Sequence, residues 1–250
     1  MRGLYMAEGG MLTQQAKLEL TGNNLSNQRT PGYKKDEAVQ TSFAEWLTLR
    51  TNVDMPSGRQ GRRPVGTMAY NVALEEDFTH LTQGSLEPTD RSLDLALEGE
   101  GFFQVEVDGE MHYTRNGHFY VDEEGFLVDT QGNPVQGEVG PIEVGRGELE
   151  VTDDGTVFVD GAEVDQLEIM DFEPEANLAK VGDNYLVPEE EIEAEPDAQV
   201  WQGFLENSNV DMTEEVVNLI ESRQNYESVQ RAMMTYDSLL ERSANELGAV

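Results

Sequence analysis

The sequence predicts an α+β protein in which a helix at each end of the chain flanks a central all-β domain. Residues 209–247 contain no Gly or Pro and repeat apolar residues at helical spacing. Residues 1–25 carry apolar residues spaced seven apart, so the two helices are expected to pair as a coiled-coil-like layer. Between the helices, short alternating runs are separated by turn dipeptides, a pattern typical of β-strands. We expect four parts: an N-terminal helix and turn over residues 1–35, an extended linker over 36–75, the all-β domain over 76–204 and the C-terminal helix over 205–250.

Composition narrows the class of protein. With 250 residues and 38% hydrophobic residues, the chain can build an ordinary core. The absence of cysteine excludes disulfides, thiolate metal sites and cysteine nucleophiles. A net charge of −34 argues against a nucleic-acid partner. The charge is uneven, because residues 1–63 have a net charge of +3 and the remaining residues −37. We infer a halophilic source, since salt screens the self-repulsion of such a chain.

The N-terminus and the apolar runs bear on targeting. No apolar run approaches the roughly 20 residues that span a bilayer. The first ten residues include a glutamate and three glycines, where a secretory signal would have an unbroken apolar segment. We expect neither a cleaved signal peptide nor a membrane anchor.

In the N-terminal helix, Leu4, Met11, Leu18 and Leu25 fall seven apart. Three glycines make this segment a poor helix on its own, so docking is expected to supply most of its stability. The C-terminal helix is the expected docking surface. The alternative is two unrelated surface helices on one globule.

A strong turn signal follows this helix. Pro31 disfavours the α conformation at Thr30, and Gly32 allows a left-handed residue next. The amides of Asn24 and Asn27 can cap the end of the helix or bind a neighbouring backbone. A polar helix end without a special role is the alternative interpretation.

Strands and turns dominate the middle of the chain. Asn-Gly, Asp-Gly and Glu-Gly dipeptides separate the runs. The predicted strands are residues 93–97, 102–107, 125–128, 156–159 and 164–169.

The C-terminal helix has Asp211 as its expected N-cap and Gly248 as its expected C-cap. Steps of four and three residues from Met212 define an apolar seam with coiled-coil spacing. Three polar residues within the seam, spaced by seven, are expected to set the register. The seam consists of Met212, Val216, Leu219, Arg223, Tyr226, Gln230, Met233, Asp237, Leu240, Ala244 and Leu247.

Two patterns suggest chemistry, and each has a simpler interpretation. Acidic turns at residues 122–125, 129–133 and 153–155 resemble calcium loops but lack the full series of oxygen ligands. If Asn116-Gly117 is a two-residue hairpin loop, His112 and His118 lie on opposite faces of the sheet and share no substrate. Nucleophile, phosphate-binding and metal-ligand motifs are also lacking. We therefore expect no catalytic residue, cofactor, metal or small-molecule substrate.

Three stretches together resemble one family. Residues 23–27 (Asn-Asn-Leu-Ser-Asn) and 30–34 (Thr-Pro-Gly-Tyr-Lys) are similar to the N-terminal signature of bacterial flagellar rod and hook proteins. Residues 93–105 and 113–119 resemble the central block of that family, and residues 205–211 with the following helix resemble its C-terminal signature. The acidity and residues 36–75 depart from the family pattern.

The resemblance implies a structural subunit of the flagellar basal-body rod in the cell envelope, of the distal type or a close paralogue. It implies self-assembly into a helical tube that transmits torque, with the terminal helices inside and the β domain outside. Expected partners are the same protein, other rod and hook subunits, and the flagellar type III export apparatus. Alternatives are a hook-type subunit, a secreted cell-wall enzyme and a calcium-dependent adhesion module. The expected assembly interface comprises Leu4, Met11, Leu18, Asn24, Leu25, Asn27, Pro31, Gly32, Tyr33, Val216, Leu219, Arg223, Tyr226, Met233, Leu240 and Leu247.

Overall fold

The computed structural model of the chain describes residues 2–42, 46–54, 60–68, 72–172, 178–182, 184–188, 193–194 and 198–247. The chain forms two compact units. The helical unit comprises residues 1–23, 36–78 and 213–250, and the β unit comprises residues 24–35 and 79–212. The boundaries expected from the sequence, at residues 35, 75 and 204, stay a prediction. The α+β class is confirmed, with a helix near each end of the chain and a β-rich middle.

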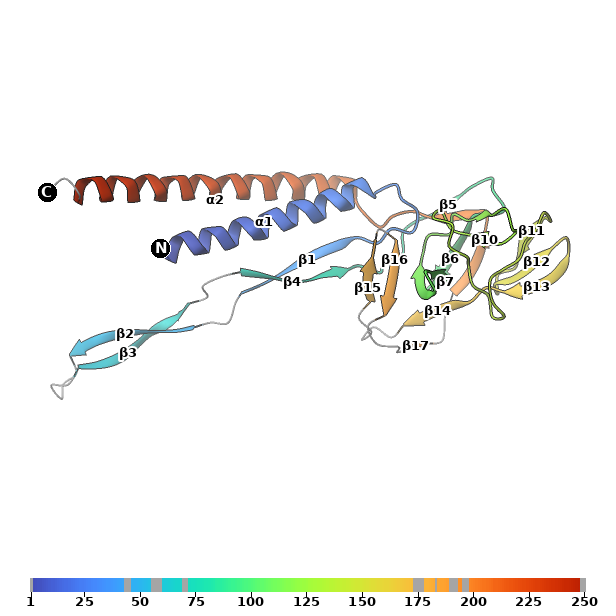
Figure 1. Ribbon diagram of the computed structural model, residues 1–250, viewed down its shortest axis with the longest axis horizontal. Helices are drawn as coiled ribbons and strands as arrows, with labels where there is room; N and C mark the ends of the chain where they lie inside the picture. Colours follow the sequence, from blue (N-terminus) through green and yellow to red (C-terminus); the bar gives the residue numbers. More distant parts are fainter. Residues whose placement is uncertain are drawn as a thin grey trace. The chain divides into compact units, whose positions relative to one another are not determined.

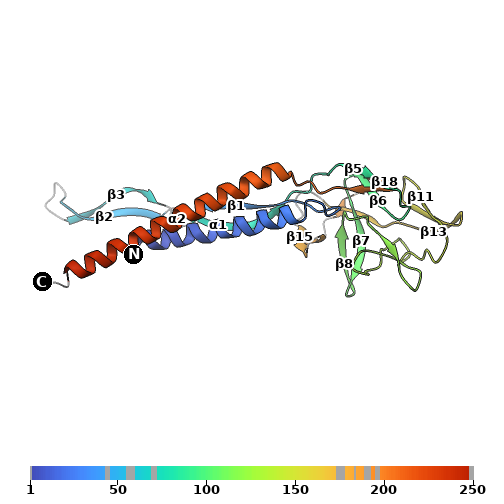
Figure 2. The ribbon, with the colours of Figure 1, turned by 90° about the horizontal axis from the view of Figure 1, so that it is seen from above.

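The helical unit contains both long helices, α1 (Arg2–Ser26) and α2 (Met212–Leu247). The two helices lie side by side and run antiparallel (Figures 1 and 2). Four strands of this unit form two antiparallel pairs, β1 with β4 and β2 with β3. Their bounds are β1 Asp36–Ser42, β2 Trp46–Asp54, β3 Gln60–Met68 and β4 Val72–Thr79.

The buried face of α1 is not the predicted row of leucines. Thr13 and Thr21 are buried, whereas Met11, Leu18 and Leu25 are only half-buried. With 3.6 residues per turn, Met11 and Leu18 lie roughly opposite Thr13 on the helix. The seven-residue spacing therefore identified an apolar row on α1, but not the face of the helix that is most deeply buried in the single chain.

On α2 the buried stripe runs close to the predicted seam. Glu215 and Ser222 are buried, and Leu219, Tyr226 and Met233 are half-buried at steps of three, four or seven residues. Five residues of the predicted seam are thus half-buried, namely Val216, Leu219, Tyr226, Gln230 and Met233, whereas each of the two fully buried side chains lies one residue before a seam position. Its start is as expected, because Asp211 stands directly before the first helical residue, whereas the expected C-cap Gly248 lies outside the described residues.

The β unit is built from short strands around one hydrophobic core. Its largest sheet has the order β15-β16-β8-β7-β14-β17, and a second sheet has the order β11-β12-β13. Three two-stranded sheets pair β18 with β6, β19 with β5 and β10 with β9. The strands are β5 Leu86–Pro88, β6 Leu95–Gly99, β7 Phe102–Val107, β8 Glu110–Thr114, β9 Tyr120–Val121, β10 Leu127–Val128, β11 Leu149–Val151, β12 Thr156–Val159, β13 Ala162–Gln166, β14 Ile169–Phe172, β15 Leu178–Val181, β16 Tyr185–Pro188, β17 Glu193–Ala194, β18 Ala198–Gln202 and β19 Phe204–Glu206.

The core draws on residues from most of these strands. Leu95, Phe103, Phe119 and Leu127 are completely buried within it, and the rings of Phe103 and Phe119 meet edge to face at 5.3 Å. The edge-to-face arrangement is the one that aromatic pairs prefer. Strands β7 and β12 have the predicted bounds. The strands predicted at 93–97 and 125–128 are shifted or shorter, as β6 and β10, and the one predicted at 164–169 is divided between β13 and β14.

The expected hairpin at Asn116-Gly117 is wrong. Strand β8 pairs with β7 and β16, while β9 pairs with β10, so the segments before and after Gly117 do not pair with each other. Instead, Leu95 N–H donates to Gly117 O at 3.0 Å. A Cβ at residue 117 would lie 1.5 Å from Leu95 O, so glycine is needed here because another backbone passes close by.

Two of the acidic turns use their carboxylates to fold the turn itself. Asp122 Oδ1 accepts hydrogen bonds from the N–H groups of Glu124, Gly125 and Phe126. Asp129 Oδ1 accepts from the N–H groups of Gln131 and Asn133. These are Asx-type turns, which explains the calcium-loop appearance without a bound ion.

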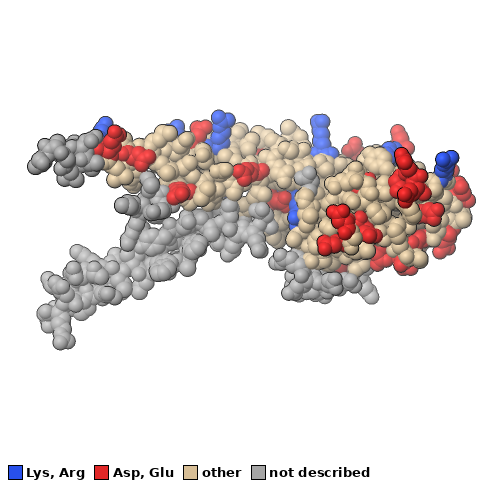
Figure 3. Space-filling model, in the orientation of Figure 1, with Lys and Arg blue, Asp and Glu red and all other residues tan. Residues whose placement is uncertain are grey.

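Acidic residues concentrate in the β unit. This unit has seven Lys and Arg against 34 Asp and Glu, a net charge of −27, whereas the helical unit has nine against 16, a net charge of −7. Figure 3 shows acidic side chains spread over the visible face of the β unit. In the part of the chain that the structure describes, no helix is long and apolar enough to cross a membrane.

Tyr185 of β16 gives the β unit a pH dependence. Its hydroxyl donates to the buried Asp129 carboxylate and accepts from Asn133 Nδ2 at 2.9 Å. Burial, reinforced by Asp129, raises the pKa of Tyr185 above its ordinary value of 10.0. Above pH 10 an unfolded tyrosine loses its proton and the folded one does not, so the stability that this group contributes below pH 10 is lost as the pH rises.

Urea unfolding between pH 9 and about 11.5 should show that the free energy of unfolding falls more steeply with pH for the wild type than for Tyr185→Phe. Tyr120→Phe, at an exposed tyrosine, serves as the control, and parallel curves for Tyr185→Phe and the wild type would contradict the assignment.

Candidate functional site

Three segments that are far apart in the sequence meet inside the β unit. They are residues 31–35, 114–117 and 205–209, each within or beside a motif singled out above. Gly32 N–H donates to Glu206 O at 2.8 Å, and Asn209 N–H donates to Tyr33 O at 3.4 Å. These backbone contacts bring together the segment by which the chain first enters the β unit and the segment by which it finally leaves it. We call this place the junction.

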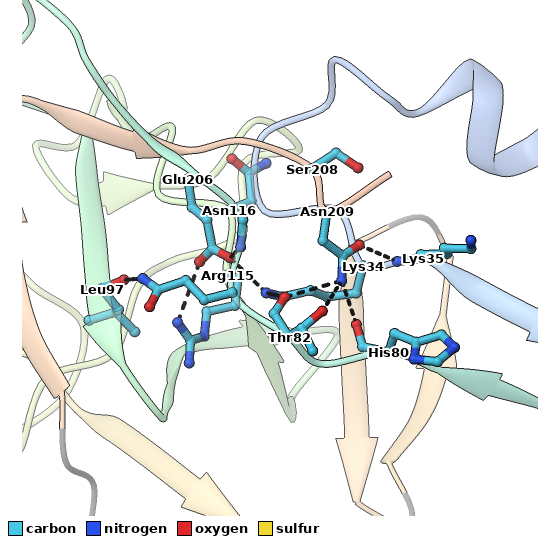
Figure 4. Close-up of polar contacts among 12 residues, drawn as sticks. Lys34, Lys35, His80, Thr82, Leu97, Arg115, Asn116, Glu206, Ser208 and Asn209 are labelled. Carbon is cyan, nitrogen blue, oxygen red and sulfur yellow. Dashed lines mark hydrogen bonds and ion pairs between the residues drawn. The ribbon is translucent and has the colours of Figure 1, made fainter. Parts of the chain in front are cut away.

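A buried carboxylate lies at the centre of the junction (Figure 4). Glu206 Oε1 accepts from Lys34 Nζ at 2.6 Å and from Gly84 N–H at 2.8 Å. Arg115 lies on the other carboxylate oxygen, with Nη1 at 3.4 Å from Oε2. The side chains of Glu206, Lys34 and Arg115 are 1%, 3% and 4% exposed. Two buried cations therefore share one carboxylate.

The electrostatics of this cluster are those of a desolvated ion triad. Burial lowers the pKa of Lys34, and Glu206 opposes this effect. Burial likewise lowers the pKa of Arg115, again against the attraction of Glu206. The loss of water disfavours the charged form of each side chain, and the Glu206 carboxylate favours it. The stability of the triad therefore depends more on Glu206 than on Lys34 or Arg115 alone.

Two further side chains fasten the N-terminal segment. Tyr33 is completely buried, and its hydroxyl donates to Asn24 Oδ1 at 3.0 Å. Lys180 Nζ lies 3.7 Å from the centre of the Tyr33 ring and donates to Lys34 O at 2.9 Å. The end of α1 and the turn after it are thus held by side-chain contacts as well as by the core.

The amide of Asn209 binds several backbone groups at once (Figure 4). Its Oδ1 accepts from Lys35 N–H at 2.7 Å. Its Nδ2 donates to His80 O at 2.8 Å and to Thr82 O at 3.1 Å. One side chain therefore joins residues 35 and 80–82 to the segment that precedes α2.

Gly32 permits the closest approach in the junction. It has φ of +68°, the left-handed region expected from the turn signal. A Cβ there would lie 2.3 Å from both Arg115 C and Asn116 N. The Pro-Gly motif is thus needed for a turn and, in addition, for contact with the segment that carries Arg115.

The expected interface residues fall into three groups. Asn24, Asn27, Pro31, Gly32 and Tyr33 all belong to the β unit and lie in or beside the junction. The described helical residues are half-buried, apart from Arg223 and Leu240, which are exposed. The half-buried residues are Met11, Leu18, Leu25, Val216, Leu219, Tyr226 and Met233. The side chains of Leu4 and Leu247 lie outside the described part of the structure.

The sequence did not assign a role to Lys34, Arg115, Glu206 or Asn209, although the first three are charged residues within quoted motifs. The signal available in the sequence was a charged residue close to apolar residues or glycines, which can indicate that the charge is buried with a partner. Two hollows lined by described residues at and beside the junction are small, since each holds about 10 Å³, room for about one water molecule. The arrangement suits fixed positioning of the chain segments.

Comparison with known proteins identifies the same segments. Residues 4–34 match the model "Flagella basal body rod protein". Residues 96–159 match "Flagellar hook protein FlgE/F/G D1 domain", and residues 202–247 match "Flagellar basal body rod FlgEFG protein C-terminal". All three segments of the junction fall within or next to these matches.

Full-length relatives agree. The flagellar basal-body rod protein FlgG of Buchnera aphidicola from Acyrthosiphon pisum is 32% identical, over 96% of this chain and 97% of the relative. FlgF of Caulobacter vibrioides is 33% identical, over 97% of this chain and 96% of the relative. FlgG of Borreliella burgdorferi is 31% identical, over 96% of each. With identities of this size along nearly the whole length, the chain belongs to the family of flagellar basal-body rod proteins.

Proposed function

We propose that the chain, a structural rod subunit of the flagellar basal body in the cell envelope, assembles with its own copies and other rod and hook subunits into a helical tube that transmits torque. The observation that carries this proposal is the apolar surface left on α2. Val217, Ile220, Met234, Leu239 and Leu240 are each about half exposed or more. A helix of 36 residues that leaves such side chains uncovered can contact neighbouring subunits through surfaces that do not close into a ring.

In the assembled tube, the seam residues of α1 and α2 pack against helices of neighbouring copies in a coiled-coil-like layer. The half-buried state of Met11, Leu18, Val216 and Met233 in the single chain supports this, because each retains apolar area to bury. Arg223, Gln230 and Asp237, spaced by seven on α2, then set the register, the first and last from exposed positions and Gln230 from a half-buried one. The junction holds the chain segments that precede α2 and follow α1 in a fixed path through the β unit.

The chain acts as a building element and carries no catalytic residue. Supporting this, the small hollows at the junction leave no room for a substrate, and its charged groups bind one another. The same proposal includes delivery to the assembly site through the flagellar type III export apparatus, which membership of the rod-protein family supports.

A pair of exposed apolar residues tests the role of α2. Leu240 on α2 is 54% exposed, and Val139 on a loop of the β unit is 91% exposed. Leu240→Asp should yield a folded protein that no longer forms tubes or fibres, because a carboxylate cannot be buried in an apolar contact without a partner. Val139→Asp should assemble like the wild type. Circular dichroism checks folding, and electron microscopy with sedimentation measures assembly. Assembly of Leu240→Asp at the wild-type critical concentration would contradict the proposal.

Salt should promote assembly. Each copy brings a β unit with a net charge of −27 close to others, and these units repel one another at low ionic strength. The screening length falls from about 10 Å at 0.1 M salt to about 3 Å at 1 M. The critical concentration, measured by sedimentation, should therefore fall as NaCl is raised to molar levels, with sorbitol at equal osmolality as the control. A critical concentration that is independent of salt would contradict both the charge argument and the inference of a halophilic source.

A further inference from the structure

A small hollow at the junction is lined by two residues that each have a buried polar atom without a partner. It holds about 10 Å³ and is lined by Gly32, Lys34, Arg115, Lys180, Asn184 and Leu186. Among the described residues, neither Arg115 Nε nor Asn184 Oδ1 has a hydrogen-bond partner, although both atoms are buried. Leaving a buried donor or acceptor unpaired costs about 1–3 kcal/mol. A ligand that forms a hydrogen bond with each of these two atoms would remove this cost.

The chemistry of the lining selects that ligand. Arg115 Nε–H can only donate, and Asn184 Oδ1 can only accept. Lys34 also lines the hollow, and two of the three N–H groups on its Nζ donate to Thr82 O and Glu206 Oε1. A molecule that accepts two hydrogen bonds and donates one would satisfy all three groups. Water does so at the size available, because buried waters make about three hydrogen bonds.

We propose that this hollow binds a single water molecule, which accepts hydrogen bonds from Arg115 Nε–H and Lys34 Nζ–H and donates one to Asn184 Oδ1. A halide ion accepts but cannot donate, so it would leave Asn184 unpaired. A metal cation is disfavoured by Lys34, Arg115 and Lys180, which all line the hollow.

The bound water extends the junction to a fourth segment. Asn184 lies in the turn between β15 and β16. Strand β16 pairs with β8, whose end leads to Arg115. The water thus connects the β15–β16 turn to the ion triad, and this inference does not depend on the proposed tube.

The test uses the full-length, ¹⁵N-labelled protein at low salt and the side-chain Nε–Hε resonance of Arg115, assigned with Arg115→Lys. The wild type should show a cross-peak between Hε and a water molecule that stays bound for longer than nanoseconds. Asn184→Leu, which removes the acceptor, should lose this cross-peak. Asn184→Asp, which retains an acceptor, should keep it.

Three outcomes would overturn the proposal. The first is a wild type without any Hε–water cross-peak, a result that needs no variant to fold. The second is a cross-peak that persists unchanged in a folded Asn184→Leu. The third is a saturable shift of the Hε resonance when gluconate is replaced by chloride at constant ionic strength, which would show that an anion occupies the hollow.

Discussion

Replacing Glu206 by Gln should destabilise the β unit by about 3–5 kcal/mol, the range found when one partner of a buried ion pair is removed. The substitution keeps the size of the side chain but leaves Lys34 and Arg115 buried without their shared carboxylate. Lys34→Met should cost less, because Glu206 still has Arg115 and the Gly84 N–H. The free energy of unfolding of the β unit, measured with urea, gives the comparison.

Glu98→Gln is the matched control, because Glu98 is an exposed residue of β6. It should change stability by about 0.5 kcal/mol or less. A loss for Glu206→Gln no larger than that for Lys34→Met would show that the carboxylate is not the central member of the triad.

Replacing Gly32 by Ala should have the second large effect. A left-handed conformation costs a non-glycine residue about 1–2 kcal/mol, and the new Cβ would lie 2.3 Å from two backbone atoms of residues 115 and 116. Because backbone cannot move aside as a flexible side chain can, the junction itself must shift. The free energy of unfolding should therefore fall by several kcal/mol more than the conformational cost alone. A lower midpoint of urea unfolding would measure this loss.

Gly161→Ala separates the two contributions. Gly161 has φ of +78°, similar to Gly32, but a Cβ there meets nothing within 4 Å. This variant should lose only the conformational cost of about 1–2 kcal/mol. Equal losses in the two variants would show that the close approach at Gly32 adds nothing.

Patterns of neighbouring residues in the sequence were enough to predict a helix and some of the strands. The bounds of α2 follow from a long run without Gly or Pro behind Asp211, and those of β7 from the alternation of residues 103–107. The bounds of β12 follow from a short apolar run between two Asp-Gly dipeptides. The hairpin at Asn116-Gly117 failed, because this dipeptide signals a glycine without saying why glycine is needed. There the reason was the passage of residue 95, which no local pattern records.

The junction was beyond such reasoning for a related cause. Lys34 and Glu206 are 172 positions apart, and Arg115 and Glu206 are 91 apart. The sequence shows that each is charged, but only the tertiary structure shows that they share one buried place. On α1, similarly, the spacing of Met11 and Leu18 identified an apolar row, while the side chains of Thr13 and Thr21 are the buried ones.

The contacts between Gly32 and Glu206 and between Tyr33 and Asn209 have a consequence for how this chain can vary. They place the first entry of the chain into the β unit, before residue 32, beside its final exit, after residue 206, although the chain also leaves and re-enters the unit between residues 35 and 79. Adjacent ends of this kind are common in domains that tolerate insertion. Residues can be added or removed between strands inside the unit without changing the distance between those ends. The length of the middle of the chain is thereby uncoupled from the geometry that the two helices require.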